Sequence, residues 1–233
     1  MAPILYKVDT SPPARAAMMV ADILGLQLNL RDLNPVLREQ DTPEFTKKNP
    51  MRTIPILDEG DYSLADSHAI MLYLIDAYGK PQHSYLYPTC KRKRATINQR
   101  LFFDCGVLFP TLRAIMARTF FAKLTHLDER MISNIEDGYR ILEAYLTETI
   151  FLADNIMTVA DISVVATVST MDGIRPIDEK KYPKLKHWLM TMSHKDFCRK
   201  INAPGCDQLV TILGNFMQNN TELVSSQKQK AKL

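Results

Sequence analysis

Glycine is scarce in this chain of 233 residues, and its placement excludes several classes of nucleotide-binding protein. Only 8 residues are glycine, against an average usage of roughly 7%. No two of them are closer than nine positions, so neither the G-x-G-x-x-G loop of dinucleotide-binding domains nor the G-x-x-x-x-G-K-[ST] loop of P-loop proteins can occur. The glycine-rich loop of protein kinases is excluded for the same reason.

The chain also lacks paired cysteines, clustered histidines and an N-terminal leader pattern. Its four cysteines form no C-x-x-C pair, and its five histidines include no i,i+4 pair and no H-E-x-x-H motif. The N-terminus has no charged-then-apolar profile of a signal peptide. We therefore expect no metal site, reduced thiols and a cytoplasmic location.

A strong excess of one charge is absent as well. The chain has 29 basic and 26 acidic residues, a formal net charge of +3. One dense basic run covers 91–94, and such a run is more typical of a solvated helix face than of a docking site. With 46% hydrophobic and 24% charged residues the composition is that of an ordinary globular protein, so neither nucleic acid nor a membrane is expected as a partner.

Proline divides the chain unevenly and indicates two architectures. Nine of the 13 prolines precede position 89. Apolar periodicity and turn residues predict a β-α-β-(α)-β-β-α order in this first part. The expected elements are a strand at 4–8, a helix between Ser11 and Gly25, a strand at 26–30, a short helix in the polar segment, strands at 54–57 and 62–64, and a helix at 67–79.

Beyond a proline-containing linker the pattern is helical almost throughout. Leu101, Cys105, Leu108 and Leu112 repeat at helical spacing, and Pro110 is expected to kink that helix. Residues 158–161, Thr-Val-Ala-Asp, form a capping box at the head of an apolar helix.

Four motifs, in this order, resemble the cytosolic glutathione S-transferases, in particular the insect epsilon class of the delta–epsilon group. They are SPPARA at 11–16, NPMRTIPIL at 49–57, DSHAIMLYL at 66–74 and NQRLFFD through GVLFP at 98–110. The similarity extends over roughly residues 3–217. It implies an α+β protein with a thioredoxin-like, glutathione-binding domain at 1–80, a linker at 81–90, an all-α helical-bundle domain at 91–221 and a disordered tail at 222–233.

Ser11 is the candidate catalytic residue. A free thiol has a pKa of about 8.5 and is mostly protonated at neutral pH. Lowering that pKa by about two units takes roughly 3 kcal/mol, and a helix N-cap offers a hydroxyl donor and the positive end of the helix dipole. From the residues alone Ser11 would be a plain helix cap; the resemblance implies that it is the serine that activates the glutathione thiol.

Further candidates for binding glutathione follow from the same resemblance. Ile54–Pro55 is expected as a cis peptide whose backbone pairs with the cysteinyl part. Asp66 with Ser67 suits the ammonium and carboxylate of the γ-glutamyl end, while on chemistry alone the two could equally be a plain helix-capping pair. Gln40 and Arg52 stand where the family commonly has histidines that bind the glycyl carboxylate. The full set is Ser11, Gln40, Arg52, Thr53, Ile54, Pro55, Asp66, Ser67 and His68, although His68 could equally be a helix-surface histidine.

The hydrophobic co-substrate is expected on the first long helix of the helical domain. The candidates there are Phe109, Leu112, Arg113, Met116, Phe120 and Phe121. Methionine and phenylalanine suit an adaptable apolar pocket, while the alternative is that these side chains are simply core.

The resemblance therefore implies a transferase that conjugates glutathione, as cosubstrate, to small hydrophobic electrophiles in detoxification, with no permanently bound cofactor, and that forms a homodimer. Two alternatives from other classes remain at this stage. One is a carrier of the same fold that binds hydrophobic compounds or hormones with weak turnover, and the other is a structural or translation-associated domain. An intact Ser11 argues against the latter.

Overall fold

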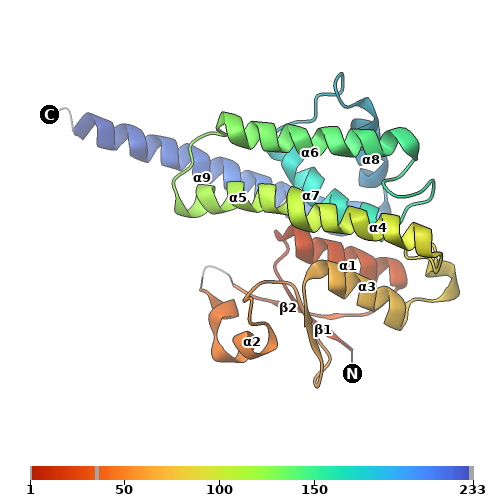
Figure 1. The fold of residues 1–233 in the computed structure, drawn as a ribbon. Coiled ribbons are helices and arrows are strands. Elements are labelled where there is room, and N and C mark those ends of the chain that lie inside the picture. The colour runs from red at the N-terminus through yellow and green to blue at the C-terminus, as the bar shows by residue number, and fades with distance from the viewer. Residues whose placement is uncertain (1, 35–36, 231–233) are drawn as a thin grey trace.

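A computed structural model describes residues 2–34 and 37–230, with side chains through 226, and consists of a small sheet-containing part followed by a helical part (Figure 1). This confirms the predicted α+β fold class. The elements are β1 (Ile4–Lys7), α1 (Pro12–Leu24), β2 (Asn29–Asp32), η1 (Glu39–Asp41), α2 (Pro43–Lys48), β3 (Ile56–Asp58), β4 (Ser63–Ala65), α3 (Ser67–Tyr78), η2 (Pro81–His83), α4 (Lys91–Phe103), η3 (Asp104–Leu108), α5 (Phe109–Phe121), α6 (Glu129–Glu148), α7 (Val159–Ile174), α8 (Pro183–Ser193), η4 (Cys198–Asn202) and α9 (Ala203–Lys230).

The four strands form one mixed sheet in the order β2-β1-β3-β4. Strand β1 pairs parallel to β2 and antiparallel to β3, and β3 pairs antiparallel to β4. Tyr6 lies opposite Ile56, and Ile56 lies opposite Ala65. The end of β1, the start of β3 and the end of β4 therefore meet at one edge of the sheet.

Helix α1 lies between the sheet and the helical part, with α3 beside it (Figure 1). Pro12 and Pro13 occupy its first turn, where a missing N–H costs nothing. Gly25 ends it with a φ of 66°, and its N–H donates to Ala21 and Asp22. Because both sides of α1 are covered, most of the helix is buried.

The interior of the helical part is organised around α7, most of which is buried. The predicted capping box is present: Asp161 accepts hydrogen bonds from the backbone N–H of Thr158 at 2.8 Å and of Leu152 at 2.9 Å. The Trp188 indole N–H also donates to Asp161, at 3.0 Å. These donors stabilise a carboxylate that has no contact with solvent.

Three details differ from the sequence-based expectations. The strand expected at 26–30 lies at 29–32, because Gly25 and the following loop turn the chain first. The interruption expected at Pro110 occurs earlier, as a π-helical turn over 104–108. Residues 222–230, expected as part of a disordered tail, continue α9, since extending a formed helix adds one hydrogen bond per residue; 231–233 lie outside the described residues.

None of the helices within the described ranges combines the length and the apolar character that crossing a membrane requires.

Candidate active site

Ser11 lies at the sheet edge defined above, at the N-terminus of α1. Its backbone N–H donates to Val8 at 3.0 Å, and its Oγ accepts from the Ala14 N–H at 3.4 Å. The side chain is half-buried. No described residue accepts the Ser11 hydroxyl hydrogen, so this hydrogen is free to be donated to a ligand at the positive end of the helix.

The loop before β3 presents the second candidate group at the same edge. The Ile54–Pro55 peptide bond is cis, as predicted. Asn49 is buried and fixes the loop, because its side-chain N–H group donates to the Thr53 carbonyl at 2.8 Å and the Thr53 hydroxyl at 3.1 Å. Thr53 thus has a structural partner within its own loop.

Asp66 and Ser67 follow the end of β4 and form the start of α3, so they lie at the same edge of the sheet. Asp66 has a φ of 74° and caps the helix by accepting from the N–H groups of His68 at 2.9 Å and Ala69 at 3.1 Å. Hydrogen bonds from His68, followed by that from Ala69, hold the pKa of Asp66 below its usual value despite partial burial. Ser67 itself is buried, with 5% exposure.

His68 is not a surface histidine, as one of the alternatives had it. Its Nε2 lies 3.3 Å from Asp104 Oδ2, and its Nδ1 lies 3.3 Å from Asp66 Oδ1. Burial opposes the charged imidazole, but the bonds to Asp104 and Asp66 outweigh it and raise the pKa of His68 to about 9. The histidine therefore links the start of α3 to the helical part.

Asp104 and Ser163 belong to this network, and sequence reasoning missed both. Asp104 is buried in η3, and its Oδ2 also accepts from the Ser163 hydroxyl at 2.5 Å. An aspartate within an apolar helical repeat was the available signal, because a charged residue at a core position requires a partner.

Arg52 lies close to Asp41, the residue that follows Gln40 in the chain, so Gln40 and Arg52 belong to the same part of the surface. Gln40 is half-buried in η1, and Arg52 Nε is 4.0 Å from the Oδ1 of the adjacent Asp41. The Arg52 side chain is 54% exposed, and its backbone has a φ of 54°. The two positions thus form one polar corner with an exposed guanidinium.

The six candidates on and around α5 differ in their surroundings. Leu112 is fully buried and belongs to the hydrophobic core, so for this residue the alternative to a place in the substrate pocket is correct. Phe109, Met116 and Phe120 are half-buried, and Arg113 is exposed. Phe121 is 88% exposed. Helix α5 directly follows η3, which carries Asp104, so its first turns border the network around His68.

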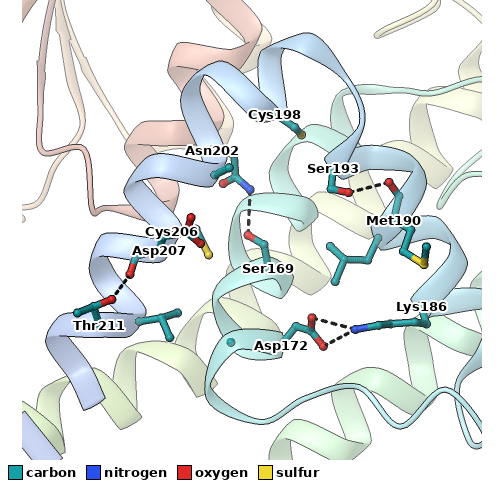
Figure 2. Close-up of a pocket in the computed structure, with 14 residues that line it drawn as sticks. Ser169, Asp172, Lys186, Met190, Ser193, Cys198, Asn202, Cys206, Asp207 and Thr211 are labelled. Atoms are coloured by element: carbon teal, nitrogen blue, oxygen red, sulfur yellow. Dashed lines mark hydrogen bonds and ion pairs between the residues drawn. The ribbon is translucent and has the colours of Figure 1, made fainter. Parts of the chain in front are cut away.

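A separate cavity of about 560 Å³ lies among α7, α8, η4 and α9 and contains none of the predicted residues (Figure 2). Several of its polar side chains are paired with one another or with nearby backbone, whereas Asn202 Oδ1 is buried without a hydrogen-bond partner among the described residues. Lys186 Nζ lies 3.1 Å from Asp172 Oδ2, and the Asn202 amide donates to Ser169 Oγ at 3.0 Å. The groups suited to bind a peptide ligand instead converge at the sheet edge.

Two family models match this chain. The model for the glutathione S-transferase N-terminal domain matches residues 5–82, and the model for the glutathione S-transferase C-terminal domain matches residues 130–196. A curated relative, glutathione S-transferase 1 of Manduca sexta, is 45% identical over 205 residues, which are 87% of this chain and 93% of the relative.

Solved structures give the same result. An epsilon-class glutathione S-transferase from the housefly, Musca domestica, has a TM-score of 0.88 and 37% identity, covering 92% of this chain and 98% of its own. A glutathione transferase homolog from Drosophila mojavensis, solved with bound glutathione, has a TM-score of 0.87 and 35% identity, covering 92% and 97%. The chain therefore belongs to the glutathione S-transferases, transferases that use glutathione as their cosubstrate.

Proposed function

We propose that this chain binds glutathione at the sheet edge, activates its thiol with Ser11 and transfers it to a small hydrophobic electrophile held by the helical domain. The observation that supports the proposal is the strand register. It brings Ser11, the Ile54–Pro55 peptide and the start of α3 to the same edge of the sheet. Three groups from separate parts of the sequence thereby face one ligand.

Activation rests on the donor properties of the N-terminus of α1. The Ser11 hydroxyl donates a hydrogen bond to the sulfur, and the helix dipole favours the negative charge of the thiolate. A hydrogen bond to a charged group contributes about 1.5–3 kcal/mol, which is of the size needed to lower the thiol pKa by about one to two units. Ser11 thus stabilises the nucleophile and does not itself react.

The rest of glutathione extends along the edge in both directions from Ser11. The backbone of Ile54 pairs with the cysteinyl unit in the manner of an added strand. Asp66 takes the γ-glutamyl ammonium group, and the N-terminus of α3 with Ser67 takes the carboxylate. Gln40 and Arg52 take the glycyl carboxylate, and Arg52 supplies the charge.

The electrophile lies against the exposed and half-buried side chains of α5. Phe109, Met116 and Phe120 supply apolar surface, and Arg113 lies at the margin. This division assigns glutathione to residues 1–80 and the co-substrate to residues 91–221, with 81–90 as the linker. We further propose that the protein acts as a homodimer in the cytoplasm.

The carrier of the same fold is less favoured. Both the relative and the solved neighbours carry the transferase name, and Ser11 keeps the position and the free hydroxyl hydrogen that turnover requires. A carrier with weak turnover would need no such group.

Replacement of the serine tests the proposal. In Ser11→Ala, turnover of a generic aryl halide should fall at least roughly tenfold, which corresponds to about 1.4 kcal/mol of lost transition-state stabilisation. The fraction of bound glutathione present as thiolate, measured by its ultraviolet absorption across pH, should fall in parallel.

The control is another helix cap, away from the sheet edge assigned to glutathione; its carboxylate also pairs with Arg118 of α5 at 2.7 Å. Asp128 caps α6 by accepting from the Met131 N–H at 2.8 Å, so Asp128→Ala removes a comparable cap. This control should lose about 1 kcal/mol of stability and keep its turnover. Turnover at the unsubstituted level in Ser11→Ala would refute the role given to the serine.

A further inference from the structure

Three side chains with metal-binding donor atoms meet where α3 contacts the helical part. They are Asp66, His68 and Cys105, and a carboxylate oxygen, an imidazole nitrogen and the thiol sulfur all lie within 4.8 Å of one another. The sequence predicted no metal site, because it has no cysteine or histidine pair at metal-ligand spacing, and Cys105 is far from the other two residues along the chain. The fold joins them by packing η3 against the start of α3.

The orientation of His68 is fixed from the side opposite the cluster. Its Nε2 lies 3.3 Å from Asp104 Oδ2, and that oxygen also accepts from Ser163 Oγ at 2.5 Å. Histidines that bind metals commonly donate their second N–H to a carboxylate, which fixes the tautomer and raises the basicity of the binding nitrogen. Asp104 supplies this arrangement here.

The other ring nitrogen faces the cluster. His68 Nδ1 is buried and has no hydrogen-bond partner among the described residues, although it lies 3.3 Å from Asp66 Oδ1. The space between this nitrogen and the carboxylate oxygen suits a positive species, which is either a proton on Nδ1 or a metal ion that replaces that proton.

Cys105 completes the set because of the π-helical turn. Single π-helical turns insert one extra residue into a helix and are frequent at functional sites. In η3 the turn directs Asp104 into the interior and leaves the adjacent Cys105 exposed, near Asp66. The side chain of Asp66 is 43% exposed, so an ion can reach the cluster from solvent.

We propose that Asp66, His68 and Cys105 bind one divalent transition-metal ion of the zinc type, with a fourth position open to solvent. Oxygen, nitrogen and sulfur donors together are typical of Zn²⁺, and three protein ligands with one open position are typical of an accessible zinc site. Binding forms bonds from the metal to Asp66 oxygen, His68 Nδ1 and Cys105 sulfur. The Cys105 thiol proton and any proton on Nδ1 pass to solvent, and no group is oxidised or reduced.

The site has a consequence for glutathione that rests on the proposed function. The same Asp66 carboxylate is assigned to the γ-glutamyl ammonium group, and one carboxylate surrounded by two other metal ligands cannot hold both cations. The metal and glutathione therefore exclude each other, and Zn²⁺ acts as an inhibitor competitive with glutathione.

Cobalt provides a direct test, because Co²⁺ bound to a cysteine thiolate has a charge-transfer absorption in the near ultraviolet. The intact chain, kept reduced with a phosphine, is titrated with Co²⁺ alone. We expect this absorption at one equivalent, its removal by one equivalent of Zn²⁺, and its loss in Cys105→Ser.

Cys90→Ser is the matched control, since Cys90 is also an exposed free cysteine. It should keep the absorption unchanged. His68→Gln should weaken Co²⁺ binding by roughly 10–100-fold while Cys105 remains in place. Absence of the absorption in the unsubstituted chain, or its persistence in Cys105→Ser, would overturn the proposal.

A second titration separates this proposal from the proposed function. S-methylglutathione is used because it lacks the thiol that would bind cobalt in solution. We expect it to displace Co²⁺ and abolish the absorption. If calorimetry shows that S-methylglutathione binds while Co²⁺ gives no absorption, the metal site is refuted alone. If Co²⁺ gives the absorption but S-methylglutathione does not bind, the metal site stands and the glutathione site is wrong.

Discussion

Arg52 is the residue to which we assign the positive charge of the proposed glutathione site, at the position where the family commonly has histidine. Its side chain is 54% exposed and its nearest acidic group, Asp41, is 4.0 Å away, so the guanidinium remains available to a ligand. We expect Arg52→Ala to raise the KM for glutathione roughly tenfold with little change in kcat, because the glycyl carboxylate is bound equally in the ground state and the transition state. Steady-state kinetics with varied glutathione measure this.

Arg140→Ala is the matched control for that measurement. Arg140 is an exposed arginine on α6 with a single weak ion pair, at 3.3 Å to Asp137. Its removal should leave both constants unchanged. An unchanged KM in Arg52→Ala would contradict the assignment of the glycyl carboxylate to this corner.

At the residue scale the sequence predicted the groups that depend on local structure. The cap at Ser11 and the cap at Asp66 follow from residues within one helical turn, and both are confirmed. The surroundings of His68 could not be predicted, because its partner Asp104 belongs to another element and its direction depends on a π-helical turn. Such a turn has no distinct sequence pattern.

Among the elements, α9 contacts the site through a glycine. A Cβ placed on Gly205 would lie 2.1 Å from the Asp9 carbonyl oxygen and 2.9 Å from Arg15 Cδ. Asp9 is in the turn that leads to Ser11. The close contact between α9 and this turn therefore requires glycine at position 205.

Gly205→Ala should be destabilising and should also lower kcat. Either α9 or the turn must shift, which costs about 1–3 kcal/mol, and a shift of the turn displaces Ser11. The melting temperature of a protein of this size changes by about 2–4 °C for each kcal/mol of stability, so calorimetry can measure the lower Tm of this variant.

Gly214→Ala on the same helix is the control. A Cβ there has no atom within 4 Å, so the alanine should stabilise the helix by about 0.5–1 kcal/mol and leave kcat unchanged. A Tm for Gly205→Ala equal to or above that of Gly214→Ala would show that the contact of α9 with the turn does not require glycine at position 205.

The order of elements was largely predictable, and their ends were less so. Alternating and helical periodicities predicted four strands and the long helices, since these patterns persist over many residues. The start of β2 and the extent of α9 depend on tertiary contacts and on helix propagation, which composition does not report. The lysines and glutamines near the end of α9 are good helix formers as well as typical tail residues.

For the whole molecule, the expected homodimer can be tested at an exposed aromatic residue. Phe102 on α4 is 72% exposed, and Met51 in the N-terminal part is 61% exposed. In a dimer that pairs the N-terminal domain of one copy with the helical domain of the other, such side chains are buried. Sedimentation velocity should give two copies of the 26.6 kDa chain, and Phe102→Glu should shift the distribution toward one copy.

Phe121→Glu serves as the comparison, because Phe121 is 88% exposed and lies at the far end of α5. It should leave the dimer intact. A single copy for the unsubstituted chain, or an unchanged dimer in Phe102→Glu, would rule out this interface.

The burial of Arg15 at the boundary between the two domains restricts which domains of related proteins can be joined in one chain. Arg15 has no exposed surface; its Nη2 donates to the Ala166 carbonyl at 2.9 Å and to the Thr170 hydroxyl at 2.8 Å, both on α7. Arg15 lies on α1 of the thioredoxin-like half, and the acceptors of its Nη2 group both lie in the other half. A chimera that joined this N-terminal domain to a helical domain without a hydroxyl at the position of Thr170 would lose one of these two acceptors for a buried guanidinium, so we expect recombination between relatives to succeed best when α1 and α7 are exchanged together.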